Sequence, residues 1–445
     1  MFQPPASAGP AEFGLVRAIG RWDLVAILIN AVIGAGIFGL PAHAFGRIGS
    51  YSIGAWAVCA LIMGLVALCS AEVGSRFAQT GGPYLYTYTA FGPTVGFMVG
   101  WLSWVSRLFS FATIGNLAVN YAGTFRPSLT EGMPRFACIS AIAIALTTIV
   151  LTGVRRSAIV NNVLTACKLL LLCGFVTIGL FFIEPVRFST PRIPPLGDFQ
   201  AALLLMTFAF IGIESAMINA GEMRSPRRDV PFALGTGLAV IALLYILIQI
   251  VCIGTLPGLA SSERPVGDAA ARMLGPVGAQ LVSVGALVTM FGTLFAVLLT
   301  GSRLPFALAE QGQLPAFLCS VDRRFRAPRN AILITAVLAW LLTLYTSFLG
   351  ALTATALTRL VGYATTCAAL IALRARESDV QSPGFRAPCG RAVAVLAVLA
   401  CTWLMFAASG RELFSVAVIA VAGAALGWGY ALLRRRRLRL SRHGE

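Results

Sequence analysis

The sequence predicts an all-α integral membrane protein with about twelve transmembrane helices, arranged as two inverted repeats followed by two further helices. Three observations support this prediction. The 445 residues are 58% hydrophobic and 11% charged, with a mean hydropathy of +0.84, which excludes a soluble globular protein. Apolar runs of about 20 residues recur, and each is long enough to cross roughly 30 Å of hydrocarbon. Two of these runs are interrupted by glycine near their middle.

The apolar runs define the expected spans and the organisation of the chain. We expect helices at 22–42, 50–76, 90–122, 135–152, 158–183, 198–220, 231–255, 277–305, 330–348, 352–374, 391–408 and 412–433. The corresponding units are a cytoplasmic segment 1–21, a first repeat 22–183, a second repeat 198–375, two additional helices within 391–433 and a basic tail 434–445. The two additional helices are featureless and apolar, and would suit a scaffold or the contact of a homodimer; a monomer is the alternative.

The first interruption lies in the first span, in the stretch NAVIGAGIFGLPA from Asn30 to Ala42. Gly34 and Gly36, on either side of Ala35, place two weak helix formers close together at mid-depth. A membrane helix can break only where protein or a wet cavity replaces its lost hydrogen bonds. The stretch therefore indicates a cavity, although the same glycines would also serve the close approach of another helix.

A second interruption lies in the sixth span, MTFAFIGIESAMINAG, where Gly212 is followed by Glu214. Gly34 and Gly212 are about 178 residues apart, and each opens a set of five spans. Because five is odd, the second set must run in the opposite orientation, as in transporters with inverted repeats and discontinuous helices. Glu214 is either a hydrogen-bonding acid within the bundle or a proton-linked or gating acid at the break.

Lys168 lies in the fifth span and is the only lysine among 34 basic residues. Desolvation disfavours a charged ammonium, and lysine can lose its proton in such surroundings whereas arginine cannot. The position indicates a charge that can be switched, or a lysine whose head reaches the inner interface.

Other polar residues within the spans are less informative. Glu72 and Arg76 are four residues apart at the end of the second span and are expected to pair as a latch. Arg107 and Arg359 must face protein or water, but their partners do not follow from the sequence. The hydroxyls of Thr289 and Thr293 either bond to their own helix or contribute to an ion site.

The distribution of arginines predicts the orientation in the membrane. Most arginines outside the spans fall in alternate connections, which become cytoplasmic if both termini are cytoplasmic. The arginines at 434–437 then anchor the tail on an anionic leaflet, and we expect no nucleic-acid partner. The location expected is the inner membrane of the cell, with membrane lipids as neighbours.

The chain carries no motif for catalysis, metal binding or nucleotide binding. Its two histidines, His43 and His443, are remote from cysteine or acidic clusters, and it contains no phosphate-binding loop. We therefore expect no metal, no cofactor and no enzymatic activity, but a carrier or channel made of helices. A membrane enzyme that uses Glu214, Arg107 or Arg359 on a lipid-linked substrate is the alternative from another class.

Three stretches resemble the amino acid permeases of the amino acid–polyamine–organocation family: NAVIGAGIFGLPA, AEVGSRFAQTGGPYLYTYTAFG and FAFIGIESAMINAGEMRSPRRDVP. The resemblance covers residues from about 20 to 375. It implies the leucine-transporter (LeuT) fold, with helices one and six unwound at the centre. Where relatives often carry Gly-Ser-Gly, this chain has Gly34, Ala35 and Gly36, which removes one hydroxyl contact to the substrate.

The resemblance also implies the roles of individual residues. Peptide N–H groups around Ala35, Gly36 and Ile37 would hold a substrate carboxylate, and carbonyls released near each break would accept from its ammonium. Phe208 would be an aromatic gate, and Lys168 would bridge the fifth helix to the first break and couple transport to protons. Val297, where a carrier of cations would want an acid or an aromatic residue, favours neutral amino acids. The expected substrate contacts are Val32, Ile33, Gly34, Ala35, Gly36, Ile37, Phe208, Phe210, Ile211 and Gly212, with Lys168 and Glu214 for coupling and Thr289, Thr293 and Val297 as additional candidates.

Proton-coupled uptake is the expected mode of transport, and exchange is the alternative mode.

Overall fold

The computed structural model describes residues 20–77, 82–152, 157–188, 193–213, 226–322, 327–376 and 383–441, and within them every regular element is a helix. The α-helices are α1 (Arg21–Val32), α2 (Gly36–Ile48), α3 (Ser52–Gly74), α4 (Gly82–Phe91), α5 (Pro93–Ala122), α6 (Gly132–Thr152), α7 (Ser157–Gly179), α8 (Leu196–Met206), α9 (Pro226–Thr255), α10 (Pro265–Glu310), α11 (Arg329–Tyr345), α12 (Phe348–Ala375), α13 (Gly390–Met405) and α14 (Gly410–Ser441). Short 3-10 turns join several of them, among them Thr207–Phe210 after α8.

Seven described helical stretches are long and apolar enough to cross a membrane, judged by length and composition. They are Gly36–Gly74, Pro93–Ala122, Gly132–Thr152, Arg228–Thr255, Pro265–Glu310, Phe348–Ala375 and Gly410–Tyr430. Four shorter apolar helical stretches coincide with other expected spans: Ala166–Phe182, Leu196–Phe210, Arg329–Tyr345 and Gly390–Met405. The helical class is thus established, whereas the count of twelve crossings stays a prediction.

The third span starts at a different residue from the one expected, and one long helix is kinked. The third span was expected from residue 90, but α4 ends at Phe91 and α5 begins at Pro93, because Gly92 between them has a φ of 89° that breaks the helix. The helix α10 is also kinked, since Gly275 has a φ of 66° and a ψ of −159°.

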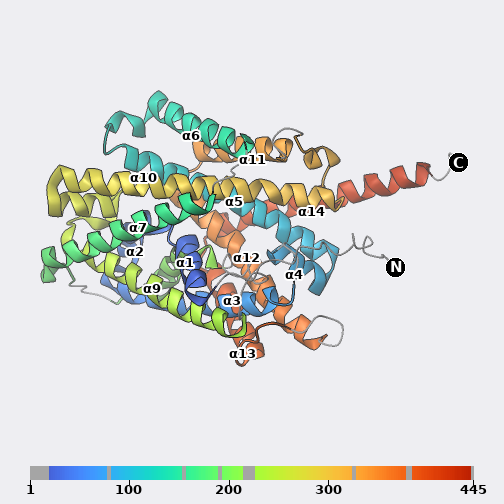
Figure 1. Ribbon diagram of the computed structural model, residues 1–445, viewed down its shortest axis with the longest axis horizontal. Helices are drawn as coiled ribbons and strands as arrows, with labels where there is room; N and C mark the ends of the chain where they lie inside the picture. Colours follow the sequence, from blue (N-terminus) through green and yellow to red (C-terminus); the bar gives the residue numbers. More distant parts are fainter. Residues whose placement is uncertain are drawn as a thin grey trace.

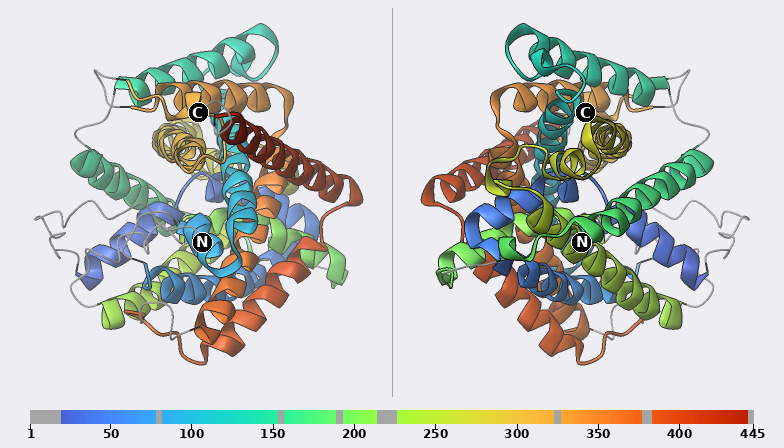
Figure 2. Two further views of the ribbon diagram at one scale, coloured as in Figure 1. Left: turned by 90° about the vertical axis from the view of Figure 1, so that its right-hand side faces the viewer. Right: turned by 90° about the vertical axis from the view of Figure 1, so that its left-hand side faces the viewer.

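In the view of Figure 1, α1 and α12 lie near the centre, between α5 and α3. The helix α5 packs against α10, α11 and α12, and α9 packs against α1 and α3. The helices α6 and α11 run side by side along one edge, and α13 lies at the opposite edge (Figures 1 and 2). The helix α14 is peripheral, because only 6% of its apolar window is buried, against 67% in α5 and α12.

A buried cluster of charges joins α3, α12 and the segment before α13. The carboxylate of Glu72 lies 3.1 Å from Arg76 Nη2, which confirms the pair expected from their spacing, and 2.6 Å from Arg374 Nη2. The backbone N–H of Ala387 donates to the same carboxylate at 2.8 Å. Glu72 thus links the ends of two helices that are about 300 residues apart in the sequence.

Candidate functional site

The first helix is interrupted where the sequence predicts it. The helix α1 ends at Val32, Ile33 leaves the helical region with φ −71° and ψ 88°, and α2 begins at Gly36. The last carbonyls of a helix and its first N–H groups have no partner within the helix. The break therefore presents carbonyl oxygens from the end of α1 and N–H groups from the start of α2, together with the positive end of the α2 dipole.

The sixth expected span is also interrupted. The helix α8 ends at Met206, a 3-10 turn covers Thr207–Phe210, and Ile211 is extended with φ −62° and ψ 131°. Gly212 follows with a φ of 116°, a conformation that L side chains rarely adopt. Glu214, which was expected to serve coupling or gating, lies outside the described residues.

The two breaks lie directly against each other. A Cβ added to Gly36 would lie 2.9 Å from the Cα of Ala209, and a Cβ added to Gly212 would lie 2.5 Å from the carbonyl oxygen of Ala31. Both contacts are between backbones, so neither glycine could carry a side chain without a shift of the chain. Residues 173 and 181 positions apart in the sequence are therefore brought together, which no local pattern specifies.

Lys168 extends from α7 to the end of α1. Its Nζ donates to the carbonyl oxygen of Asn30 at 2.7 Å and to that of Ile33 at 2.8 Å, and the residue is 7% exposed. The ammonium thus takes up carbonyls that the broken helix releases, as the hydrogen-bonding rule for buried backbone requires. This geometry does not match the alternative in which the head of Lys168 reaches the membrane interface.

Tyr245 of α9 joins both breaks and was not singled out from the sequence. Its hydroxyl is 3.0 Å from the carbonyl oxygen of Ala209 and 3.3 Å from that of Val32, and its side chain is fully buried. The carbonyls of Val32 and Ile33, expected to accept from a substrate, therefore already accept from protein donors. A carbonyl oxygen has two lone pairs, so each retains capacity for a second donor. A tyrosine in the middle of an apolar helix is the signal that would have found this residue.

The helix α10 borders the first break through its threonines. A Cβ built on Gly34 would lie 3.6 Å from Thr293 Oγ1, which places this hydroxyl beside the unwound segment. Thr293 Oγ1 donates to the carbonyl of Thr289, and Thr289 Oγ1 donates to that of Gly285, each at 2.8 Å. Both hydroxyl protons thus form hydrogen bonds within α10. Only the lone pairs of the two hydroxyl oxygens could interact with an ion or substrate. Val297, one turn further on, is buried.

The two phenylalanines of the second break have different surroundings. The ring of Phe208 lies against the first break, with Cδ1 3.3 Å from a Cβ built on Gly36. The ring of Phe210 instead packs at 6.1 Å from Trp56 and 5.5 Å from Tyr245, measured between centroids. Phe208 is therefore beside the site, whereas the side chain of Phe210 belongs to the core and only its backbone is at the break.

The start of α2 is held by two further hydrogen bonds that the sequence did not reveal. Gln249 Nε2 donates to the carbonyl oxygen of Pro41 at 3.2 Å, and its Oε1 accepts from Trp56 Nε1 at 3.1 Å. Tyr121 donates to the carbonyl oxygen of Phe38 at 2.8 Å. These buried polar side chains fix α2 relative to α3, α5 and α9.

The other two charged residues expected within the membrane, Arg107 and Arg359, are not at the breaks. The Cβ of Arg107 on α5 is 3.2 Å from a Cβ built on Gly301 of α10, and Arg359 on α12 is 7% exposed. Among the described residues, no group of three or more His, Cys, Asp or Glu is arranged to hold a metal ion.

Comparison with known proteins identifies similar sequences along almost the whole chain. Residues 19–426 match the family model described as amino acid permease. The methylthioribose transporter of Bacillus subtilis (strain 168) is 27% identical over 91% of this chain and 91% of its own length. The branched-chain amino acid permease BcaP of the same organism is 26% identical over 90% of each chain. The arginine/ornithine antiporter of Pseudomonas aeruginosa is 31% identical over 70% of this chain and 67% of its own length.

Proposed function

The chain belongs to the amino acid permease family, and we propose that it carries amino acids across the membrane by alternating access. The proposed substrate site lies between the two breaks. The single observation that carries the proposal is the contact of the breaks themselves, at Gly36 with Ala209 and at Gly212 with Ala31.

The peptide groups at the breaks match the carboxylate and the ammonium that all amino acids share. The N–H groups of Ala35, Gly36 and Ile37 at the start of α2 would bind the carboxylate, as N–H groups at helix N-termini bind other anions. The carbonyls of Ile33, Phe210 and Ile211 would accept from the ammonium. Recognition by peptide groups is independent of the side chain, so specificity would come from the neighbouring Phe208, Thr293 and Val297.

We propose neutral amino acids as substrates, because the described side chains beside the first break are apolar or hydroxylic apart from Lys168, whose ammonium would repel a cationic side chain. Phe208 and Val297 offer no charge to a cationic side chain. The similar proteins are named for branched-chain amino acids, for arginine and ornithine, and for methylthioribose, a sugar without a zwitterionic group. Methylthioribose therefore serves as the discriminating probe, since it cannot use paired carboxylate and ammonium contacts.

Lys168 is the proposed coupling residue. Its ammonium bonds Asn30 and Ile33 at the first break, so loss of the proton would weaken a link between α7 and α1. A proton can shift an equilibrium between two gate states only through such a difference in contacts. Glu214 is proposed as a second proton-linked or gating group.

The architecture proposed for this carrier is the LeuT-like one, with repeats 22–183 and 198–375 and additional helices within 391–433. The interruptions of the first and sixth spans support it, since each repeat then begins with a discontinuous helix. Both termini would be cytoplasmic in the inner membrane, because the arginine-rich connections then face inward.

The test is uptake of labelled amino acids by proteoliposomes, preceded by a thermal-shift screen of the twenty amino acids, common amines and methylthioribose. We expect a neutral amino acid to be accumulated under an inward proton gradient. Lys168→Ala should abolish accumulation while the protein stays folded, and Arg187→Ala, at an exposed pair with Glu184, should leave it unchanged. Full proton-driven accumulation by Lys168→Ala would contradict the coupling role, and a response to methylthioribose alone would contradict the substrate class.

Exchange is the second candidate mode, favoured by the similarity to the arginine/ornithine antiporter. An exchanger would show counterflow that depends on internal amino acid and is indifferent to a pH gradient. The same proteoliposomes, loaded or empty, distinguish the two modes.

A further inference from the structure

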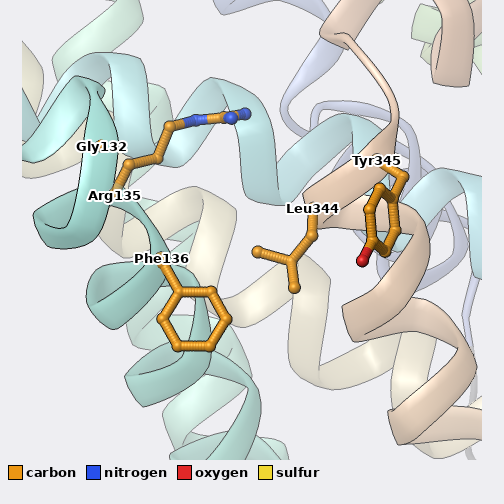
Figure 3. A pocket seen from close by; sticks show the side chains of 5 residues that line it. All are labelled: Gly132, Arg135, Phe136, Leu344 and Tyr345. Carbon is orange, nitrogen blue, oxygen red and sulfur yellow. The ribbon is translucent and has the colours of Figure 1, made fainter.

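A hollow of about 280 Å³ lies at the ends of α6 and α11, remote from the breaks. Gly132, Arg135 and Phe136 line it from α6, and Leu344 and Tyr345 line it from α11. Figure 3 shows Arg135 and Phe136 extending from one helix toward Leu344 and Tyr345 on the other. We propose that this hollow binds the phosphate headgroup of an anionic membrane phospholipid, with Arg135 as its cation. The proposal is independent of the transported substrate.

The position of the hollow is that of a membrane–water interface. Arg135 is in the first turn of α6, and Tyr345 is the last residue of α11, so both lie where their helices leave the apolar core. Arginine and tyrosine are enriched at such positions, since each combines an apolar stem or ring with a polar end. Tyr345 is 84% exposed, which leaves its ring available to a lipid.

The electrostatics of the hollow favour an anion. Arg135 donates through Nη2 to the amide oxygen of Asn116, a neutral acceptor. Within the described part of the chain, no carboxylate forms an ion pair with Arg135, and the nearest acid in the sequence, Glu131, is exposed and bonds Arg135 only through its backbone. A guanidinium has five N–H donors, and the N-terminus of α6 adds its positive dipole end at the same place.

The surface next to the hollow indicates a lipid as the source of that anion. On α6, Met133, Ile144 and Ile149 are exposed, and on α11, Val337 and Leu338 are exposed. Only 22% of the apolar window of α6 is buried. In a membrane these side chains contact acyl chains, and the hollow lies at the end of that apolar surface. A phospholipid whose chains cover the two helices can thus place its phosphate beside Arg135.

The bound headgroup would stabilise a junction of three helices. Asn116 of α5 accepts from Arg135 and donates through Nδ2 to the carbonyl oxygen of Thr346, just beyond α11, at 3.0 Å. Phe136 of α6 packs edge to face on Trp340 of α11, with centroids 6.0 Å apart. A phosphate on Arg135 would extend this network and restrain the ends of α5, α6 and α11.

The test is native mass spectrometry of the purified, delipidated protein with added phosphatidylglycerol or phosphatidylcholine. We expect Arg135→Gln to retain about fivefold less phosphatidylglycerol than the natural protein, as one basic side chain near an anionic surface predicts. Arg411→Gln, at an exposed arginine at the start of α14, is the matched control and should retain the natural amount. Phosphatidylcholine should bind all three equally.

A second pair of variants covers the case in which Arg135→Gln does not fold. Tyr345→Glu places a negative charge in the hollow at an exposed position and should lower phosphatidylglycerol retention, whereas Tyr345→Gln should not. Phosphatidylglycerol should also raise the thermal midpoint of the natural protein, and inorganic phosphate should not. Equal retention of phosphatidylglycerol by Arg135→Gln and the natural protein would overturn the proposal, and an equal thermal effect of inorganic phosphate would overturn the lipid as the ligand.

Discussion

The hydroxyl of Tyr245 lies 3.0 Å from the carbonyl oxygen of Ala209, at the second break, while it also lies 3.3 Å from that of Val32 at the first. One side chain from α9 therefore contacts both unwound segments. Lys168 donates to the carbonyl oxygens of Asn30 and Ile33 at the first break. Together, Tyr245 and Lys168 replace hydrogen bonds that the two interrupted helices lack. These contacts hold the geometry on which the proposed substrate site depends.

Tyr245→Phe removes this hydroxyl and retains the ring that packs on Trp56 and Phe210. We expect the free energy of unfolding to fall by about 1 kcal/mol, the usual contribution of one hydrogen bond in a membrane protein or in water. Uptake should fall more than this loss of stability explains, because the breaks lose a shared donor. Thermal midpoint and uptake are measured together, with Tyr88→Phe at an exposed tyrosine as the control. Natural uptake in Tyr245→Phe would contradict the positioning role.

Gly212→Ala tests the close approach of the two breaks. The φ of 116° is unfavourable for alanine, and the added Cβ would lie 2.5 Å from the carbonyl oxygen of Ala31. Strained backbone positions of this kind cost about 1–3 kcal/mol, and the contact with Ala31 adds to that cost. The thermal midpoint in detergent should fall markedly. Gly235→Ala, where an added Cβ meets nothing within 4 Å, should be neutral or stabilising. An equal midpoint for both variants would show that the breaks are not in contact.

Glu72→Gln tests the buried charge cluster at the ends of α3 and α12. Removal of one partner from a buried ion pair costs about 3–5 kcal/mol, because the remaining buried charge loses its counter-ion. Arg76 and Arg374 would both lose their carboxylate. The matched variant Glu184→Gln breaks an exposed pair with Arg187 and should change stability by less than about 1 kcal/mol. If thermal unfolding does not separate the two variants, the cluster does not stabilise the fold.

Lys168→Arg tests whether the coupling residue must release a proton. Arginine keeps its charge at all accessible pH values, and its larger planar head does not reproduce the bonds of Nζ to Asn30 and Ile33. Acidification of the outer solution should stimulate uptake by the natural protein and leave the variant unaffected. Initial rates at several outer pH values measure this difference, with Arg187→Lys as the conservative control. A natural pH response in Lys168→Arg would mean that another group carries the proton.

The sequence by itself determined the class of the protein and the places of its irregularities. Apolar runs near 20 residues long can satisfy their backbone in lipid only as helices, so helix positions followed from hydropathy. Glycine is the residue least committed to a helix, so the interruptions at Gly34–Gly36 and at Gly212 could also be located. The pairing of Glu72 with Arg76 followed from a spacing of four residues on one helix face.

The tertiary structure alone decided which polar groups meet between different helices. Tyr245, Gln249 and Arg374 find their partners on helices far away in the sequence, and no periodicity encodes such contacts. Phe208 and Phe210 are two residues apart in one apolar run and were both expected at the substrate, yet the ring of one faces the break and that of the other the core. The physical reason is that a helix pattern specifies only the position of a side chain around its own axis. The packing of the helices then determines what that side chain contacts.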